Sequence, residues 1–239
     1  MGRPLNSGSW GRLAFADAAQ TRAADWRFTA LPQRTAQDSF LPRGWGRSYG
    51  DVCINSGGSH LDTTRLDRFV AFDTELGLLR CEAGLTLAQI LEVVVPQGWF
   101  IPVLPGTRFV TLGGAIGNDV HGKNHRHAGS FGCHVRSLTL RRSDGECYHC
   151  DSENNAELFA ATIGGLGLTG LILDAEIQLL RIESAQVECE DLSFSSVAEF
   201  AALYEESADW AYTVSWIDCF ARGGNVGRGI SSRARHASG

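Results

Sequence analysis

Three glycine-rich segments constrain the fold of this chain more than any other feature. They span residues 43–51, 105–125 and 164–170, and the chain holds 28 Gly against 6 Pro. Glycine lacks a side chain to pack, but it permits left-handed backbone and lets the main chain approach another group closely. Segments of this kind cannot fill a hydrophobic core well. They indicate a backbone laid directly against a ligand.

The first segment has the sequence Arg-Gly-Trp-Gly-Arg-Ser-Tyr-Gly-Asp over residues 43–51. Closely spaced glycines allow successive backbone N–H groups to turn inward and surround an anion. A Walker loop is excluded because the sequence GxxxxGK[ST] is absent. The alternative, a plain surface turn, has no need for Arg43, Arg47, Ser48 and Tyr49 together, so we predict a phosphate-binding loop.

The second segment combines Pro105-Gly106-Thr107 with the small residues of 111–125. Such a run suits a flat or extended ligand that lies against the main chain. His121, His125 and His127 raise the alternative of a metal site. No carboxylate or cysteine completes a ligand set at the usual spacing, so we predict no metal here.

The third segment contains a literal GxGxxG at residues 165–170, and Glu190 follows 20 residues later. A dinucleotide-binding fingerprint of this type requires a strand before it and a helix that begins inside it. Here a short helical pattern precedes the glycines and strand-like alternation follows them. This reversed context disfavours a nicotinamide site.

Short strand patterns alternate irregularly with a few helices, which predicts the α+β class. Residues 1–40 are weakly patterned, with Trp10 and Trp26 as expected anchors. Further along, the patterns predict two hairpins, at 68–82 and 135–150, and two strands, over 170–180 and 212–220. They also predict a helix over 156–163 capped by Asn155. Two more helices are expected to begin at capping boxes, one at Thr86 and Gln89 and the other at Ser196 and Glu199.

Charge and composition exclude several classes of protein. The formal net charge of −6 disfavours binding to a nucleic-acid backbone. Only the arginines of 221–235 keep a nucleic-acid-associated protein open as an alternative. With 44% hydrophobic residues the chain has enough apolar material for a sizeable core. Neither an apolar run of about 18 residues nor an apolar signal region occurs, so we expect a cytoplasmic protein, peripheral to a membrane at most.

The seven cysteines are odd in number and scattered along the chain. This distribution fits reduced thiols better than a disulfide framework. Cys147 and Cys150 form a CxxC pair, which raises a zinc site as an alternative. A second CxxC at a usable spacing is missing, so structural thiols are the preferred interpretation.

The glycine-rich segments, in this order, resemble the FAD-binding domain of vanillyl-alcohol-oxidase-type flavoproteins, also called the PCMH-type FAD domain. The motifs that carry the resemblance are RGWGRSYGD (43–51), PGTRFVTLGGAIGNDVHGKNH (105–125), AGSFGCHVRSL (128–138) and GGLGLTGLI (164–172). The combination of HGKNH with AGSFG is similar to the branch that oxidises polyprenylphosphoryl ribose.

The resemblance implies a division of the chain into three parts. Residues 1–40 would be an N-terminal segment, residues 41–182 a PCMH-type FAD-binding domain of two α+β subdomains, and residues 183–239 the beginning of a substrate-domain sheet. Since family members continue with more substrate domain and a return to the FAD domain, we expect a truncated product, a fragment or one subunit of a split enzyme.

The resemblance also assigns residues to the cofactor. Those expected to contact FAD are Pro42, Arg43, Gly44, Trp45, Gly46, Arg47, Ser48, Tyr49, Gly50, Asp51, Val52, Gly106, Thr111, Leu112, Gly113, Gly114, Asn118, Asp119, Val120, His121 and Ile172. Many family members attach FAD covalently through a histidine at the position of Arg47. A non-covalent FAD is therefore expected here.

Tyr49, His121 and Lys123 would face the flavin and the substrate as the catalytic residues. The implied reaction oxidises a secondary hydroxyl of a sugar, as in polyprenylphosphoryl-ribose 2′-oxidation, and a reductase partner would complete an epimerisation. A sugar-lactone or alditol oxidase and a non-catalytic FAD-binding module or subunit stay open as alternatives.

Lys123 is the single lysine among 21 basic residues. The alternative interpretation is that Lys123 is an ordinary solvent-exposed charge on a loop. A solvated lysine tolerates replacement by arginine, and the other 20 basic residues of this chain are all arginine. A compact ammonium beside a flavin would not tolerate that replacement, since the two cations differ in shape and hydration.

Overall fold

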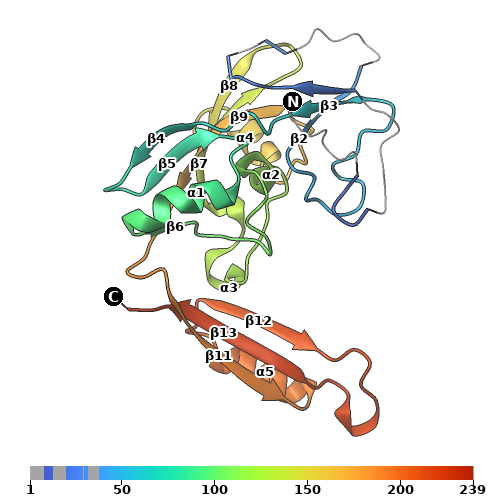
Figure 1. Cartoon of the computed structure of the whole chain (residues 1–239), viewed down its shortest axis with the longest axis vertical. Helices are drawn as coiled ribbons and strands as arrows, with labels where there is room; N and C mark the ends of the chain where they lie inside the picture. Colours follow the sequence, from blue (N-terminus) through green and yellow to red (C-terminus); the bar gives the residue numbers. More distant parts are fainter. Residues whose placement is uncertain (1–7, 13–19, 29, 32–37, 239) are drawn as a thin grey trace.

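The computed structural model describes residues 8–12, 20–28, 30–31 and 38–238. It has two lobes, drawn one above the other in Figure 1. The first lobe contains the residues up to Ile182, and the second lobe contains Val187–His236. Helices and sheets are mixed in both lobes, which confirms the predicted α+β class.

A five-stranded antiparallel sheet forms the frame of the first lobe. Its strand order is β4–β5–β9–β7–β8. The strands are β4 (Phe69–Asp73), β5 (Leu78–Glu82), β9 (Leu171–Gln178), β7 (Val135–Arg141) and β8 (Cys147–Asp151). The two predicted hairpins are confirmed as β4–β5 and β7–β8, and β9 joins them by pairing with both β5 and β7.

The helix α1 (Leu87–Val94) begins at the predicted capping box. Thr86 Oγ1 accepts a hydrogen bond from the N–H of Gln89 at 3.3 Å, and the Gln89 side chain accepts one from the N–H of Thr86 at 2.9 Å. Pro96 lies in the short 3-10 turn η1 (Val95–Gln97), and Gly98 ends it with φ of +78°. The strand β6 (Trp99–Phe100) follows and pairs with β10 (Leu180–Arg181).

The core of the first lobe lies between the large sheet and the helices α1 and α2 (Leu112–Gly117). The side chains that are fully buried there include Leu79, Leu87, Ile90, Leu112, Ile116, Phe131, Leu138, Leu140 and Ile177. Members of the sheet and members of both helices thus share one apolar cluster. This packing fixes where α2 and the glycine-rich loop before it lie.

The helix α4 (Ala156–Thr162) begins directly after Asn155, but the predicted cap is wrong. Asn155 has left-handed backbone with φ of +50°, and its side chain makes no cap hydrogen bond. The amide Nδ2 of Asn155 instead donates to the carbonyl of His149 at 2.7 Å. The side chain therefore ties the helix start to β8 rather than to the helix N–H groups.

Two further features of the first lobe surround its loops. The short helix α3 (His125–Ala128) and the turn η2 (Phe131–His134) follow α2 along the chain. A small parallel sheet has the order β1–β3–β2 and consists of β1 (Thr21–Ala23), β3 (Ser59–Asp62) and β2 (Phe40–Arg43). The strand β2 ends at Arg43, where the first glycine-rich segment begins.

The second lobe is a three-stranded antiparallel sheet with one helix. Its order is β11 (Val187–Phe194), β13 (Gly229–His236) and β12 (Tyr212–Ile217). The helix α5 (Val197–Glu206) packs on one face through the rings of Phe194 and Phe200, whose centroids are 5.3 Å apart. The turn η3 (Gly223–Asn225) lies between β12 and β13.

Two predictions for the second lobe are corrected by the structure. Ser196 caps α5 as expected, but Glu199 does not complete a capping box, because its carboxylate accepts hydrogen bonds from the N–H and hydroxyl of Ser195. The strand predicted to reach residue 220 ends at Ile217. There Asp218 starts a turn by accepting the N–H of Phe220 at 3.0 Å.

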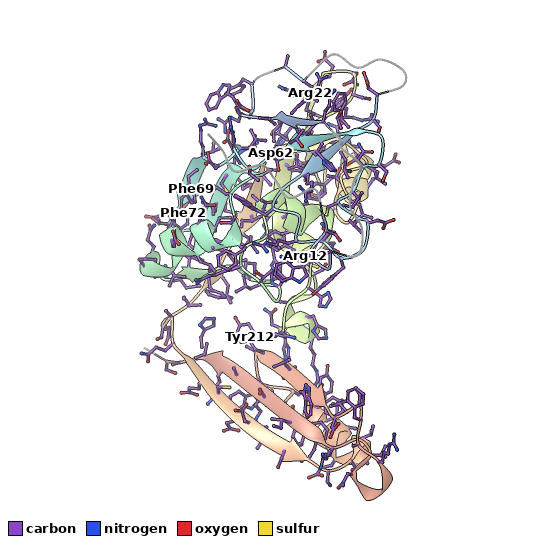
Figure 2. All side chains as sticks on the ribbon, turned by 45° about the vertical axis from the view of Figure 1, so that its right-hand side comes forward. Arg12, Arg22, Asp62, Phe69, Phe72 and Tyr212 are labelled. Carbon is purple, nitrogen blue, oxygen red and sulfur yellow. The ribbon has the colours of Figure 1, made fainter. Side chains whose placement is uncertain are left out.

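Several contacts join the two lobes beyond the connecting segment, among them the guanidinium of Arg126, which donates to the carbonyl of Tyr204 at 2.9 Å and to the carboxylate of Glu205 at 3.1 Å. Tyr212, labelled in Figure 2, lies at the end of the second-lobe sheet that faces the first lobe, and its hydroxyl is 3.1 Å from Nε2 of His236. The ring of His236 also contacts that of Phe100. On the other side, the N–H of Thr213 donates to the carbonyl of Lys123 at 2.8 Å.

Among the described residues, no helix is both long enough and apolar enough to cross a membrane.

Candidate functional site

A cavity of about 530 Å³ opens in the first lobe where the three glycine-rich segments meet. Its volume lies in the range of roughly 300–1,000 Å³ that small-molecule sites occupy. Its lining contains eight glycines, which are Gly44, Gly46, Gly106, Gly113, Gly114, Gly117, Gly167 and Gly170. The wall of the cavity is therefore largely main chain.

The first glycine-rich loop is held close to the second at Gly44. A Cβ at this position would lie 2.6 Å from Oγ1 of Thr111 and 2.8 Å from its Cγ2, so only glycine fits. Arg43, just before it, is 4% exposed, and its carbonyl accepts the N–H of Thr63 at 3.0 Å. Gly46 adopts left-handed backbone with φ of +64° and turns the loop toward the cavity.

The second loop leads into α2 through Thr111. Its Oγ1 accepts the N–H of Gly114 at 3.1 Å and so caps the helix. Beside it, Gly113 lies against Ala83, whose Cβ would be 3.0 Å from an added methyl group. Gly106, by contrast, borders open space, which leaves room for a ligand against the backbone.

Two non-glycine residues near the cavity have left-handed backbone, which is uncommon and costs energy. Asp119 has φ of +40°, and its Oδ1 accepts the N–H of Gly132 at 2.8 Å. Leu166 has φ of +54°, and its N–H donates to the carbonyl of Gly117 at 2.7 Å. These hydrogen bonds hold the second and third segments in the shape that opens the cavity.

The sequence-predicted cofactor residues gather at this cavity with few exceptions. Gly50 and Asp51 lie outside its lining, and Leu112 is fully buried in the core beneath it. The others all line it, and they are Pro42, Arg43, Gly44, Trp45, Gly46, Arg47, Ser48, Tyr49, Val52, Gly106, Thr111, Gly113, Gly114, Asn118, Asp119, Val120, His121 and Ile172.

Sequence reasoning missed several lining residues that come from elsewhere in the chain. They include Trp10, Cys53, Thr63, Ala83 and Thr162. Most of these reach the cavity only because the sheets bring distant segments together, so no local pattern marks them. Val110 and Leu171 also line the cavity; they lie inside the quoted motifs 105–125 and 164–172 but were not assigned to the cofactor. Gly167 and Gly170 lay inside a segment already singled out for its glycines.

The loop of residues 121–125 presents two predicted catalytic side chains. Asn124 is buried and its Nδ2 donates to the carbonyl of Pro102 at 2.6 Å. A Cβ on Gly122 would lie 2.6 Å from the carbonyl oxygen of Leu104. These two buried positions anchor the loop and leave the side chains of His121 and Lys123 exposed.

A second cavity of about 400 Å³ lies between this loop and the second lobe. Gly106 and His121 line both cavities, so the two spaces adjoin at these residues. Lys123 lines only the second cavity, and Tyr49 lines only the first. From the second lobe the lining residues are Phe200, Tyr204, Thr213, Val214, Ser215 and Ile217.

The cavity of the first lobe carries positive charge. Arg43 and Arg47 both line it, and the Nε of Arg47 is buried without a hydrogen-bond partner in the described part of the chain. Burial, assisted by the neighbouring Arg43, also lowers the pKa of His60 on β3 below its usual value of 6.5. An anionic group in the cavity would be stabilised by this charge.

The CxxC thiols do not converge on one point. Cys147 and Cys150 lie three residues apart on β8, so their side chains point to opposite faces of the sheet. Cys150 is fully buried, and burial raises the pKa of its thiol. Within the described residues, no three His, Cys, Asp or Glu side chains gather as metal ligands.

Comparison with known proteins identifies the fold around the cavity. The family described as "FAD binding domain" matches residues 33–151, which include the first two glycine-rich segments. The chain is 39% identical over 231 residues to decaprenylphosphoryl-beta-D-ribose oxidase of Mycolicibacterium smegmatis, an alignment that covers 94% of this chain and 50% of that protein. Residues 33–151 belong to the FAD-binding domain family. This result confirms the resemblance inferred from the glycine-rich motifs.

Other relatives of this FAD domain carry names of different enzymes, an oxidase and a reductase. L-gulonolactone oxidase of Bos taurus is 31% identical over 135 residues, 56% of this chain and 30% of that protein. Delta(24)-sterol reductase of Homo sapiens is 30% identical over 109 residues, 45% of this chain and 21% of that protein. The chain thus spans about half of the first relative and less of the others.

The residues around the first cavity fit FAD. The glycine-lined wall suits a long molecule with a flat ring, because the main chain can lie against it without side chains between. The unpartnered Nε–H of Arg47 is a donor for which a phosphate oxygen is a fitting acceptor. FAD has both of these chemical features.

Proposed function

We propose that this chain binds FAD without a covalent bond and forms the FAD-binding part of an oxidase that acts on a secondary hydroxyl of a sugar. The observation that carries the proposal is the junction of the two cavities at Gly106 and His121. A substrate in the second cavity would meet a flavin in the first at this junction. The ribose of a polyprenyl phosphate is the proposed substrate.

Bound FAD supplies the acceptor for the hydride that leaves the carbinol carbon. The chain's own residues then have separate tasks. The imidazole of His121, at the junction, takes the hydroxyl proton as the alcohol becomes a ketone. The exposed ammonium of Lys123 in the second cavity holds the negative charge of the substrate phosphate, and the phenol of Tyr49 contacts the substrate from the first cavity.

A reductase that reduces the ketone from the opposite face would complete an epimerisation of the sugar carbon. This partner is part of the proposal because an oxidase alone yields only the ketone. A sugar lactone or an alditol is the competing substrate class, in keeping with the name of the relative L-gulonolactone oxidase.

A second candidate function is FAD binding without turnover by this chain alone. The face of the second-lobe sheet opposite α5 exposes Val214, Trp216 and Ile230, which are neighbours on β12 and β13. An exposed apolar face of this kind marks a contact with another polypeptide. In this case the substrate site would be completed by residues outside this chain.

The visible spectrum of the purified chain tests the proposal. We expect oxidised flavin bands and the release of all flavin into the supernatant after acid precipitation. Anaerobic addition of a short-chain polyprenylphosphoryl ribose should then bleach the bands. Bound flavin that no sugar bleaches would favour the second candidate, and a folded chain that takes up no FAD would refute both.

Flavin that stays with the acid precipitate would contradict the non-covalent attachment alone. Lys123→Arg is the matched variant for the substrate contact, since it keeps the charge and changes the shape of the cation. We expect this variant to retain FAD and to be bleached more slowly by the phosphate-bearing substrate.

A further inference from the structure

Residues 8–12, here called the N-terminal strap, lie on the first glycine-rich loop. The carbonyl of Gly8 accepts a hydrogen bond from Nη2 of Arg43 at 2.8 Å, and the N–H of Trp10 donates to the carbonyl of Ser48 at 3.0 Å. Ser9 between them is 3% exposed. The strap is therefore attached to the loop at two positions, Gly8 and Trp10.

The strap is not part of the matched FAD domain, which begins at residue 33. Yet Trp10 lines the same cavity as the loop residues 42–49. Its indole is 51% exposed, so it adds little to a hydrophobic core. Figure 2 labels Arg12, at the end of the strap, on the first lobe. The position of Trp10 at the cavity needs an explanation other than core packing.

The contact that explains it is with Arg47. The guanidinium carbon of Arg47 lies 4.8 Å from the centroid of the Trp10 ring, within the distance of a cation–π interaction. The Nε of the same guanidinium is buried and has no hydrogen-bond partner in the described part of the chain. A buried donor at the lining of a cavity is satisfied when a ligand brings the acceptor.

We propose that Trp10 is a positioning residue that holds the Arg47 guanidinium for a phosphate group in the FAD cavity. The indole face fixes the plane of the guanidinium, so that Arg47 binds the phosphate without first losing its rotamer freedom. The strap thereby extends the FAD site beyond the matched domain. The inference rests on FAD as the occupant of the cavity.

The rate of FAD release from the full 239-residue chain tests this role. Trp10→Leu keeps an apolar side chain and removes the aromatic face, whereas Trp10→Phe keeps a face. We expect Trp10→Leu to release FAD roughly tenfold faster and Trp10→Phe to stay within about threefold of the parent chain. Free flavin fluorescence follows the release directly.

Arg47→Ala shows whether Trp10 acts through the guanidinium. If it does, adding Trp10→Leu to Arg47→Ala leaves the release rate unchanged, since the group to be positioned is gone. Trp26→Leu is the matched control, because Trp26 also stacks on an arginine, Arg68, at 4.4 Å but lies outside the cavity lining. We expect that control to release FAD at the parent rate.

Three outcomes would overturn the proposal. They are multiplicative effects of Trp10→Leu and Arg47→Ala in the double variant, an unchanged release rate in Trp10→Leu, and a Trp10→Phe variant as fast as Trp10→Leu. A parent chain that is folded but binds no FAD would overturn the assignment of the cavity together with this inference, so the two failures are distinguishable. The thermal midpoint of each apo variant separates release from unfolding.

Discussion

The close approach of the two glycine-rich loops makes Gly44→Ala the most informative single substitution. The added methyl would lie 2.6 Å from Oγ1 of Thr111 and 2.8 Å from its Cγ2, so the threonine must move. Moving it breaks the cap on α2, where Oγ1 accepts the N–H of Gly114. Loss of such a cap costs about 1 kcal/mol, and an overpacked contact costs about 1–3 kcal/mol. We therefore expect a loss of about 2–4 kcal/mol in the free energy of unfolding.

Urea unfolding of the apo chain measures this loss, and FAD titration measures its effect on binding. Gly224→Ala is the control, because Gly224 borders open space in the second lobe and has no left-handed backbone. If the Thr111 side chain is removed, Gly44→Ala should lose most of its effect on the free energy of unfolding. In a Thr111→Ala background, Gly44→Ala should cost less than half of its value in the parent chain. Equal costs in both backgrounds would refute the reasoning.

Three further substitutions test the buried polar groups and the helix cap. The lowered pKa of His60 means that the unfolded chain binds a proton more readily, so the free energy of unfolding should fall as the pH drops below about 6.5. Urea titrations across pH 5–7 should show a weaker fall in His60→Gln than in the parent chain. Arg80→Ala leaves Asp174, which is 5% exposed, without its 2.6 Å ion-pair partner, and should cost about 2–3 kcal/mol by urea unfolding. A loss below about 0.5 kcal/mol would contradict the role of that pair. Thr86→Ala removes the capping box of α1 and should cost about 1 kcal/mol, whereas an unchanged thermal midpoint would contradict that role.

Local patterns predicted those parts of the fold that depend on neighbouring residues. The turn at Asp144 and Gly145 fixed the β7–β8 hairpin, and the Thr86 capping box fixed the start of α1. Asn155 was predicted wrongly as a cap because its hydrogen bond goes to His149 on another strand. The Asn155 side chain thus bonds to a carbonyl on β8 in place of the N–H groups of its own helix.

In the candidate site too, features that depend on neighbouring residues could be predicted, and features that depend on tertiary contacts could not. Glycine spacing pointed to the loops that line the FAD cavity, since close backbone approach is a requirement that a sequence displays. Thr63 gave no such signal, because the β2–β3 pairing brings it to the cavity. Trp10 was expected to be an anchor, but its contact with Arg47 was not predicted, because the two residues are 37 positions apart in the sequence.

The lining of the FAD cavity ends at Ile172, and all of its described members precede the second lobe. A ribosome makes the chain from the N-terminus at roughly 5–20 residues per second, and domains fold as units in that order. The cavity can therefore close while β11–β13 of the second lobe are still being synthesised. FAD that binds at this stage would contact segments from Trp10 to Ile172 at once and favour the folded first lobe by mass action. Cofactor supply during translation, and not only after it, would then govern how much of the chain reaches its native fold.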